Sequence, residues 1–431
     1  MKRTMVLKTA AVLGAASLVL AACGGSEETA TETPAETTEE VVVEEEPTAE
    51  AVALACKIGT MLPQTGNLAF LGPPEFAGVD LAVAEIQAAG GPIAENLFGD
   101  SGDTSTDIAS QTADSHIAAG VTAIIGAASS GVSLTVIDKI TGAGVIHFSP
   151  ANTSPTLSDY ADNGLYFRTA PSDLFQGAVL AQLMLDEGFD TIGIMALDDA
   201  YGTGLANALE AGFTESGGVV SDKIIYNPQA AEFSAEVTQM KAGNPQAIAL
   251  IGFEESTKIV QEMIKQGVGP DNVPLYLVDG NLSATAFAEL PEGIMVGVKG
   301  TLPGAAAPEA FQAKLLEVNP DLTDFSYAAE SYDAVNLLAL AMDVAGSCDG
   351  AAVAQALIDV SKGGEKCSTY ADCKALLDSG ADIDYDGVSG PVEFADNGDP
   401  SVATMGVYEY TANDAIAPQL DLFVTGTVPT S

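Results

Sequence analysis

Short apolar runs and longer amphipathic stretches alternate along most of the chain. Residues 57–62 form an apolar run that ends in Pro63-Gln64-Thr65-Gly66, and residues 76–89 carry apolar side chains at helical spacing before Gly90-Gly91. This order predicts a buried strand, a turn, and a helix that stops at glycine. Because strands that alternate with helices form parallel sheets covered on both faces, the pattern predicts an α/β fold.

The alternation continues to residue 278. Further strands are predicted at 121–125, 145–148, 165–169, 191–196, 246–251 and 274–278. Further helices are predicted at 106–119, 132–141, 174–187, 204–215, 234–242 and 255–266. The stretch before residue 106 is expected to be a polar connection, and 149–162 is expected to be a long loop.

One supersecondary pattern occurs twice. The segments AIIGAASSGVSLTVIDKITGAGVIHFSP and AIALIGFEESTKIVQEMIKQGVGPDNVPLYLVDG share the order strand, glycine, polar corner, helix, glycine, strand, polar corner. Two copies indicate two similar lobes, each an open α/β sheet whose ligands collect at the carboxyl ends of the strands. If the lobes face each other, the corners at 129–130, 149–153 and 198–202 converge on one cleft with Phe253 and Asp279.

Length and charge narrow the possible functions. A chain of 431 residues exceeds what one hydrophobic core usually serves, which agrees with two lobes. The 60 acidic residues outnumber the 15 basic ones and give a formal net charge of −45. A surface of this charge argues against recognition of nucleic acid or of anionic lipid.

The first 23 residues have the layout of an export signal. Basic residues precede an apolar run at 10–20, which is too short to predict a membrane span. The end of this segment, Leu20-Ala21-Ala22-Cys23, resembles a bacterial lipobox, which implies lipidation of Cys23 and attachment to a membrane; loss of Cys23 within an ordinary cleaved signal is the alternative. Residues 24–55 are expected to be a disordered linker, because ten glutamates and no basic residue lie between Glu27 and Glu50.

Four cysteines follow the linker. An even number in an exported protein favours disulfides over thiol chemistry. Cys367 and Cys373 close a short loop, so we pair them, and Cys56 then pairs with Cys348 by elimination. Four cysteines allow three pairings, and zinc is the weaker alternative because no CxxC spacing and no nearby histidine accompany them.

The first polar corner, Ser129-Ser130-Gly131, directly precedes a predicted helix. The start of a helix has unpaired N–H groups and a partial positive charge, which suit an anion. Small residues let a carboxylate approach, and their hydroxyls add donors; Thr153, in the corner after the next strand, can supply another. A simple helix cap is the alternative role of Ser129 or Ser130.

The second lobe offers the opposite charge. Asp279 ends an apolar strand, where a lone carboxylate can offset a cation, although Asp-Gly is also a common turn. Tyr201 and Phe253 can form aromatic walls or pack in a core. An anion pocket on one lobe and a carboxylate on the other together predict a receptor for a zwitterion.

The order of several segments resembles type I periplasmic binding proteins, specifically the branched-chain amino acid and amide group that feeds ABC transporters. The segments are KIGTMLPQTG, GPPEFAGVDLAVAEIQAAGG, IIGAASSG, HFSPANTSPTLS, FRTAPSDLFQG, DDAYGTGLANAL, EFSAEVTQMKAGNPQAIALIGFEE and GVSGPVEFADNGDP. The resemblance extends from about residue 57 to the C-terminus. It implies two doubly wound parallel-sheet lobes joined by a three-segment hinge.

The resemblance also implies roles for single residues. Ser130, with Ser129 beside it, corresponds to the residue that binds the ligand carboxylate, and Thr153 to the threonine that assists it. An ammonium group is expected at Asp279 and at the backbone carbonyl of Asn152. The implied aromatic positions are Tyr201, Phe253, and either Phe70 or Leu71 in the first loop. Phe253 lacks a hydroxyl, and Asp279 is shorter than the glutamate frequent in the family.

The hinge crossings are expected near Ala170, Leu302 and Gly390. They give a first lobe of residues 56–170 plus 303–390 and a second of 171–302 plus 391–431. The protein is expected to be a monomer that needs no cofactor, performs no catalysis, and delivers an amino acid to an ABC permease. A sensor of the same fold, a binder of amides or urea, and a hydrolase are the alternatives.

An acidic loop and two histidines are the remaining candidates for metal binding or catalysis. Asp382, Asp384, Asp386 and Glu393 have the spacing of an EF-hand calcium loop, but no second helix is predicted after them, so a solvated acidic turn is favoured over a metal site. The only histidines are His116 and His147. His147 lies in an apolar strand, and a core role is expected because no nucleophile elbow, HExxH motif or Ser-His-Asp arrangement accompanies it.

Overall fold

The computed structural model describes residues 54–283 and 285–430. The chain divides into two units, residues 1–51 and 52–431, and only the second is described here. The predicted signal segment and Cys23 lie outside the described residues, as does nearly all of the predicted linker.

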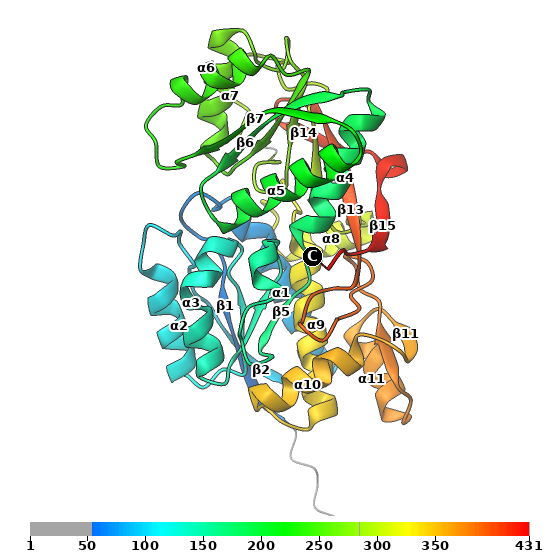
Figure 1. The fold of residues 1–431 in the computed structure, drawn as a ribbon. Coiled ribbons are helices and arrows are strands. Elements are labelled where there is room, and N and C mark those ends of the chain that lie inside the picture. Colours follow the sequence, from blue (N-terminus) through cyan, green and yellow to red (C-terminus); the bar gives the residue numbers. More distant parts are fainter. Residues whose placement is uncertain (1–53, 284, 431) are drawn as a thin grey trace, which may run out of the picture. The chain divides into compact units, whose positions relative to one another are not determined.

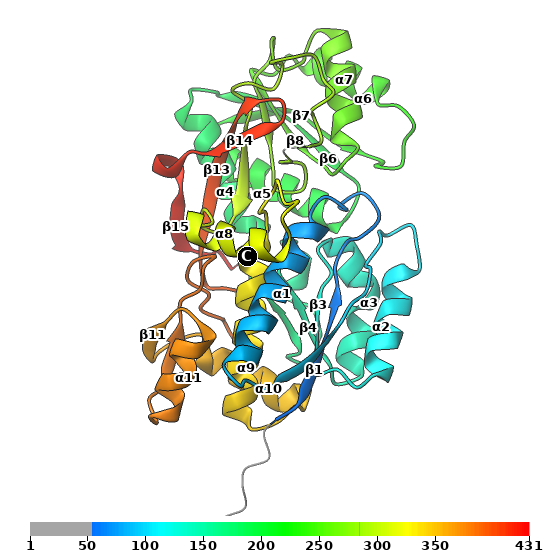
Figure 2. The ribbon, with the colours of Figure 1, turned by 180° about the vertical axis from the view of Figure 1, so that it is seen from behind.

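The first sheet has five parallel strands in the order β2-β1-β3-β4-β5. Helices α2 and α3 cover one face, and α1, α9 and α10 cover the other, as Figures 1 and 2 show. Apolar side chains fill both helix–sheet layers, so the central strands are buried on both sides. The strands are β1 (Cys56–Met61), β2 (Ile93–Leu97), β3 (Ala123–Gly126), β4 (Ile146–Ser149) and β5 (Tyr166–Arg168).

The second sheet is mixed. Its path is β14-β13-β10-β9-β8-β6-β7, and β15 pairs with β13. Strands β6 to β10 are parallel, whereas β13 runs antiparallel to β10, β14 and β15. The expectation of a purely parallel sheet is therefore corrected at this edge. The strands are β6 (Thr191–Leu197), β7 (Val219–Tyr226), β8 (Ala247–Ile251), β9 (Leu275–Leu277), β10 (Lys299–Pro303), β13 (Val402–Ala412), β14 (Ala415–Pro418) and β15 (Val424–Thr427).

The predicted helices are confirmed, with ends shifted by a few residues. They are α1 (Gly72–Ala88), α2 (Ile108–Ala118), α3 (Ser130–Gly142), α4 (Asp173–Asp186), α5 (Ala200–Glu215), α6 (Ser234–Gly243) and α7 (Ser256–Gln266). Helices α8 (Glu309–Val318), α9 (Ala328–Ala345), α10 (Gly350–Val360) and α11 (Tyr370–Asp378) follow. Two 3-10 turns, η1 (Pro155–Leu157) and η2 (Leu420–Leu422), lie in loops. No single helix of the described residues is long and apolar enough to cross a membrane, although α9 and α10 together, bent by 109°, have sufficient length and composition.

Side-chain caps fix where several helices begin. The hydroxyl of Ser129 accepts a hydrogen bond from Val132 N at the start of α3, and the Asp199 carboxylate accepts one from Gly202 N at the start of α5. These bonds satisfy N–H groups that have no partner inside the helix. The helices therefore begin at the polar corners that end the preceding strands.

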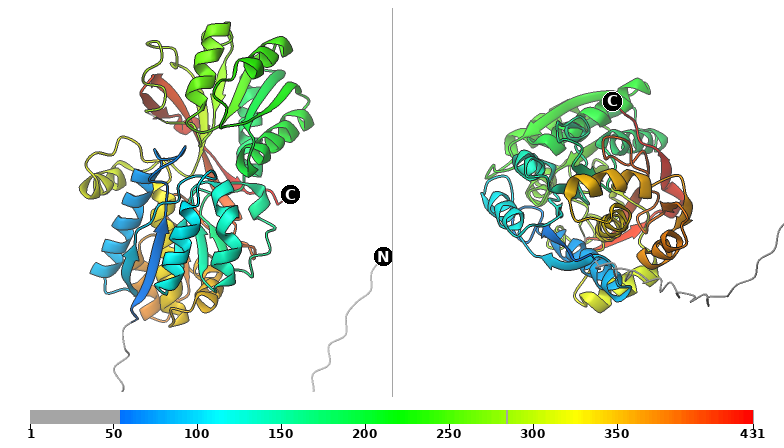
Figure 3. Two further views of the ribbon diagram at one scale, coloured as in Figure 1. Left: turned by 90° about the vertical axis from the view of Figure 1, so that its left-hand side faces the viewer. Right: turned by 90° about the horizontal axis from the view of Figure 1, so that it is seen from below.

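The chain passes between the two sheets three times, after β5, after β10 and before β13 (Figure 3). A backbone hydrogen bond from Ala305 N to Ser389 O joins the second and third passages, and Gly304 N donates to Thr404 O in β13. Ala170 and Gly390 lie in the first and third passages, and Leu302 lies at the end of β10, just before the second; the limits of the two lobes expected at these residues stay a prediction.

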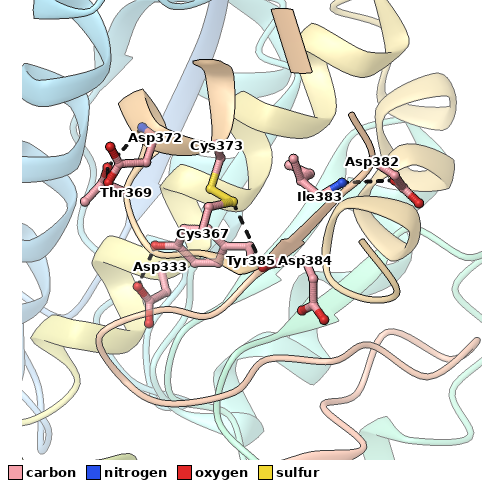
Figure 4. Close-up of a disulfide and its surroundings, with 9 residues drawn as sticks. All are labelled: Asp333, Cys367, Thr369, Asp372, Cys373, Asp382, Ile383, Asp384 and Tyr385. Carbon is pink, nitrogen blue, oxygen red and sulfur yellow. Dashed lines mark hydrogen bonds between the residues drawn. A yellow bond between two sulfur atoms is a disulfide. The ribbon is translucent and has the colours of Figure 1, made fainter. Parts of the chain in front are cut away.

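Both predicted cysteine pairs are disulfides in the structure. Cys56 at the start of β1 joins Cys348, between α9 and α10, across 292 residues of sequence. Cys367 ends β11 (Glu365–Cys367), which pairs with β12 (Ile383–Tyr385), and joins Cys373 in α11 (Figure 4). The first disulfide links the start of β1 covalently to the turn between α9 and α10, and the second closes a local loop between β11 and α11.

Removing the long-range bridge is expected to destabilise the fold more than removing the local one. A disulfide typically contributes about 2–4 kcal/mol, and its effect on the unfolded chain grows with the length of the closed loop. Urea unfolding of Cys56→Ala/Cys348→Ala and of Cys367→Ala/Cys373→Ala measures both losses. A larger loss for the second pair would contradict the expectation.

Two carboxylates of the acidic loop after α11 form ion pairs with a neighbouring lysine. Lys366 Nζ lies 3.3 Å from Asp384 Oδ2 and 3.1 Å from Asp386 Oδ2. Within residues 54–283 and 285–430, no three His, Cys, Asp or Glu side chains gather as metal ligands do. The residues after the loop make isolated bridges at Pro391 and Phe394 and form no helix before β13. Here the structure shows an acidic turn paired with a lysine.

Candidate functional site

Corners from both predicted lobes line one small pocket with an empty volume of about 240 Å³. They follow the carboxyl ends of β3, β4, β6, β8 and β9, where an open α/β sheet binds its ligands. The lining residues are Leu68, Leu71, Ala128, Ser129, Ser130, Ala151, Thr153, Tyr201, Phe253, Asp279, Gly280 and Tyr327.

Hydroxyl groups gather at the α3 side of the pocket. The N-terminus of α3 lies here because β3 ends at Gly126, where the backbone has φ +117° and an added Cβ would lie 2.0 Å from Met61 O. Ser130 Oγ accepts hydrogen bonds from Thr153 N and Ser154 N, which leaves its proton available to an acceptor in the pocket. Thr153 Oγ1 is buried and has no hydrogen-bond partner among the described residues. This side can therefore donate to an anion.

Ser129 is a helix cap, which was the alternative role predicted for it. Its hydroxyl caps α3 through Val132 N at 3.3 Å, and its side chain also lines the pocket. The cap holds the helix start in place beside Ser130.

The opposite side of the pocket carries the buried carboxylate of Asp279. Oδ1 accepts from Gln176 Nε2 at 2.9 Å and from the Tyr201 hydroxyl at 2.8 Å, and Oδ2 accepts from the Tyr327 hydroxyl at 2.7 Å. Burial raises the pKa of Asp279, while these donors act in the opposite direction. Since no Lys, Arg or His lines the pocket, a cation there would have Asp279 as its counter-charge.

Apolar side chains form the remaining walls. The rings of Tyr201 and Phe253 stack, with centroids 5.4 Å apart and planes inclined by 7°. Leu68 and Leu71 line the pocket from the loop before α1. The walls suit an aliphatic or aromatic group between the two polar sides.

Two predicted site residues do not line the pocket. The side chain of Asn152 donates to the carbonyls of Ala127 and Ala128, and its own carbonyl accepts from Arg168 Nη1 at 3.4 Å. The predicted role of Asn152 as an ammonium acceptor is therefore corrected: the residue holds its own loop together by hydrogen bonds. Of the two alternatives in the first loop, Leu71 lines the pocket, whereas Phe70 lines a neighbouring cavity.

Sequence reasoning missed Tyr327, Gln176 and Leu68. Tyr327 precedes α9 in a left-handed conformation with φ +60°, rare for a bulky residue, which directs attention to it once the backbone is known. Gln176 is the fourth residue of α4. No motif marks either residue, because their partner Asp279 is 103 positions from Gln176 and 48 from Tyr327.

A second acid lies behind the hydroxyl side. Asp173, the first residue of α4, is fully buried, and its carboxylate has no hydrogen-bond partner among the described residues. Burial raises the pKa of Asp173 well above its usual value, and repulsion from Asp279 adds to the shift; the nearby Thr153 hydroxyl and Arg168 act against it. Asp173 is therefore a second buried acid near the pocket, close enough to Asp279 for the two to repel each other.

An ion pair fixes the loop that presents Thr153. Arg168 is fully buried at the end of β5, and its Nε and Nη2 lie 2.6 Å and 2.8 Å from the two oxygens of Asp399. Arg168 Nη1 also donates to Ser154 O at 2.9 Å. This bidentate pair links the loop after β4 to the third passage.

Neither histidine reaches the pocket. His116 Nε2 lies 2.9 Å from Thr60 O, and the His147 ring meets Tyr166 edge-on. Burial lowers the pKa of His147 to about 4, so this ring is neutral at neutral pH. The expected core role of His147 agrees with this placement.

Comparisons with known proteins give one family. Residues 55–415 match the family model described as periplasmic binding protein. The chain is 26% identical to Leu/Ile/Val-binding protein homolog 3 of Brucella melitensis, over 70% of this chain and 83% of that protein. It is 28% identical to the chemotactic signal transduction system substrate-binding protein BasB of Halobacterium salinarum, over 78% of this chain and 82% of that protein.

Solved structures share the fold. The branched-chain amino acid transporter substrate-binding protein LivJ of Streptococcus pneumoniae, solved in complex with isoleucine, matches with a TM-score of 0.68 and 22% identity. The match covers 86% of this chain and all of that one. Two lobes of doubly wound α/β sheet are therefore the architecture of this chain.

Proposed function

Because the chain belongs to the periplasmic binding protein family, we propose that it captures a free amino acid with an aliphatic side chain and delivers it to an ABC permease. The family and its relatives are substrate-binding proteins that act outside the cytoplasm, so the chain is a binding protein and not an enzyme. The ligand and the permease are part of the proposal.

One observation carries the proposal: the pocket has donors without an acceptor on one side and a carboxylate without a cation on the other. Ser130 and Thr153 face the α-carboxylate in this proposal, and Asp279 faces the α-ammonium. Both charges of the ligand would lie out of water, where hydrogen bonds to charged groups are strong. A neutral amide or urea would leave Asp279 without a counter-charge.

The proposed side-chain preference rests on the apolar walls. Leu68, Leu71 and Phe253 surround the space beside the polar groups, and the pocket is small. The names of relatives support the same choice, since a Pseudomonas aeruginosa relative is a leucine-, isoleucine-, valine-, threonine- and alanine-binding protein. We therefore propose leucine, isoleucine or valine as the ligand.

Calorimetry with matched ligands tests the proposal. Leucine is compared with leucinamide, which lacks the carboxylate, and with 4-methylpentanoate, which lacks the ammonium group. Each missing charge is expected to weaken binding by about 1.5–3 kcal/mol, or roughly tenfold to over a hundredfold. Equal binding of leucine and leucinamide, or tighter binding of urea or a neutral amide, would contradict the proposal.

Thr153→Val tests the anion side with little effect on folding. The Thr153 hydroxyl makes no hydrogen bond of good geometry among the described residues, although it lies near the buried Asp173 carboxylate, so its removal is expected to change the free energy of unfolding by no more than about 1 kcal/mol. Leucine affinity is expected to fall by about 1.5 kcal/mol. Thr156→Val, at an exposed position outside the pocket, is the matched control. Unchanged leucine affinity in Thr153→Val would remove this residue from the proposed site.

A sensory role is a second candidate, favoured by the Halobacterium salinarum relative, whose name assigns it to a chemotactic system. Both roles require the same pocket. Deletion of the gene separates them: loss of leucine uptake supports delivery to a permease, and loss of taxis with normal uptake supports sensing.

We also propose that Cys23 is lipidated and holds the protein at the outer face of a membrane. The proposal rests on the sequence Leu20-Ala21-Ala22-Cys23. Mass spectrometry of the membrane fraction is expected to find an acylated N-terminal cysteine, and Cys23→Ala is expected to release the protein from that fraction.

A further inference from the structure

A second and larger cavity lies at the passages between the lobes. The space inside it, including the part open to solvent, is about 1190 Å³. The walls come from the second passage, from the loop that precedes α9, and from the β13–β14 hairpin. Tyr327 lines both this cavity and the pocket described above, so it separates the two spaces.

The wall of this cavity contains a buried carboxylate without a partner. Glu330, in the first turn of α9, is only 3% exposed, and no hydrogen bond from another described residue reaches its carboxylate. Its Oε1 packs against Gly304 in the second passage, where φ is +93° and an added Cβ would lie 1.9 Å away. Glu330 O accepts a hydrogen bond from Thr169 Oγ1 in the first passage. The residue therefore lies where the passages meet.

A second carboxylate lies behind Glu330. Glu75, in the first turn of α1, is fully buried, and neither of its oxygens has a hydrogen-bond partner among the described residues. Glu75 and Glu330 repel each other. Asp324 and Asp414 also line the cavity, and no Lys, Arg or His does. The cavity thus gathers acidic groups, with no basic side chain among its lining residues.

The remaining walls are apolar and aromatic. They include Leu282, Leu302, Phe325, Tyr408 and Ile416. A hydrated inorganic cation gains nothing from such walls, and the described residues provide no cluster of three metal ligands here. An organic cation can bury its apolar body against them and place its charge at the carboxylate.

We propose that this cavity binds an amphipathic organic cation, a primary ammonium or guanidinium group on an apolar body, paired with the Glu330 carboxylate. Because the cavity is separate from the amino-acid pocket, this site does not depend on which ligand that pocket takes. Its walls come from both predicted lobes, so an occupant contacts the segments that would bend during lobe closure.

Protonation of Glu330 gives the binding a pH dependence. Burial raises the pKa of Glu330 to about 8, and Asp333 adds to the shift. Glu75, Tyr327 and Tyr408 also interact with this carboxylate from neighbouring elements. Since only the ionised form pairs with a cation, affinity is expected to increase between pH 6 and pH 8, with proton release on binding.

Calorimetric titration of the full chain with phenethylammonium, at a pH above 8 where the Glu330 carboxylate is ionised, tests the proposal, with neutral 2-phenylethanol as the matched probe. The cation is expected to bind about tenfold or more tightly than the alcohol. Glu330→Gln removes the charge, and Ala306→Phe fills the cavity without changing charge; each is expected to weaken cation binding about tenfold or more. Glu309→Gln, exposed on α8 and outside the cavity lining, is expected to bind as the wild type does.

Three outcomes of these titrations would contradict the proposed cation site. Absence of cation binding, equal binding of the alcohol, or cation affinity unchanged by Ala306→Phe would each refute it. Circular dichroism establishes whether each variant is folded. If Glu330→Gln does not fold, Ala306→Phe and the two probes decide the outcome.

Discussion

Asp399→Ala is expected to lower the free energy of unfolding by about 3–5 kcal/mol. The substitution removes the bidentate partner of Arg168, whose guanidinium is fully buried and would remain as an uncompensated charge. A buried pair of this kind adds little to stability over an apolar replacement of both residues, but loss of one partner is costly. Urea denaturation followed by circular dichroism measures the loss.

Asp396→Ala is the matched control for this experiment. Asp396 lies three positions before Asp399, is exposed, and carries the same charge. Its substitution is expected to change stability by less than about 0.5 kcal/mol. Similar losses in both variants would show that general charge repulsion, and not the buried pair, determines the effect.

Asp279→Ala is expected to weaken leucine binding by about 1.5–3 kcal/mol, or roughly tenfold to over a hundredfold. The substitution removes the counter-charge proposed for the ammonium group. It also leaves three buried donors, on Gln176, Tyr201 and Tyr327, without their acceptor. Calorimetric titration with leucine measures the change.

Asp271→Ala provides the control for charge alone. Asp271 is exposed in the turn that leads to β9, the strand that ends at Leu277 just before Asp279. The control is expected to bind leucine as the wild type does. The binding of 4-methylpentanoate is also informative: Asp279→Ala is expected to bind it no more weakly than the wild type does, because this ligand has no ammonium group. A large loss for that ligand would indicate a collapsed pocket.

The alternation of strands and helices could be predicted from the sequence because buried parallel strands are continuous apolar runs. The two missed strands of the first 278 residues, β2 and β7, are both edge strands. β2, with the sequence Ile-Ala-Glu-Asn-Leu, exposes residues 94 and 95, and β7 is mostly half-buried or exposed. An edge strand is covered less completely, so its sequence lacks the apolar run that marks a central strand.

The site could be predicted where residues follow the end of a strand. This position is shared by Ser130, Thr153, Phe253 and Asp279. The order of the strands in the sheets brings them together, so the conformation of the longer loops need not be known. Tyr327 could not be found in this way, because it reaches the pocket from the loop before α9. Asn152 has the right position, but the polar groups of its own loop satisfy it. Only the three-dimensional structure distinguishes a residue that faces the pocket from one that supports it.

The disulfide between Cys56 and Cys348 has a mechanical consequence. The described chain enters the first sheet at the amino end of β1, whereas the pocket lies at the carboxyl ends of the strands, about 20 Å away for a six-residue strand. Tension on the N-terminal segment would reach Cys56 first and pass through the covalent bridge into the α9–α10 turn. The force would thus be shared between β1 and the helical layer, at the end of the first sheet far from the pocket.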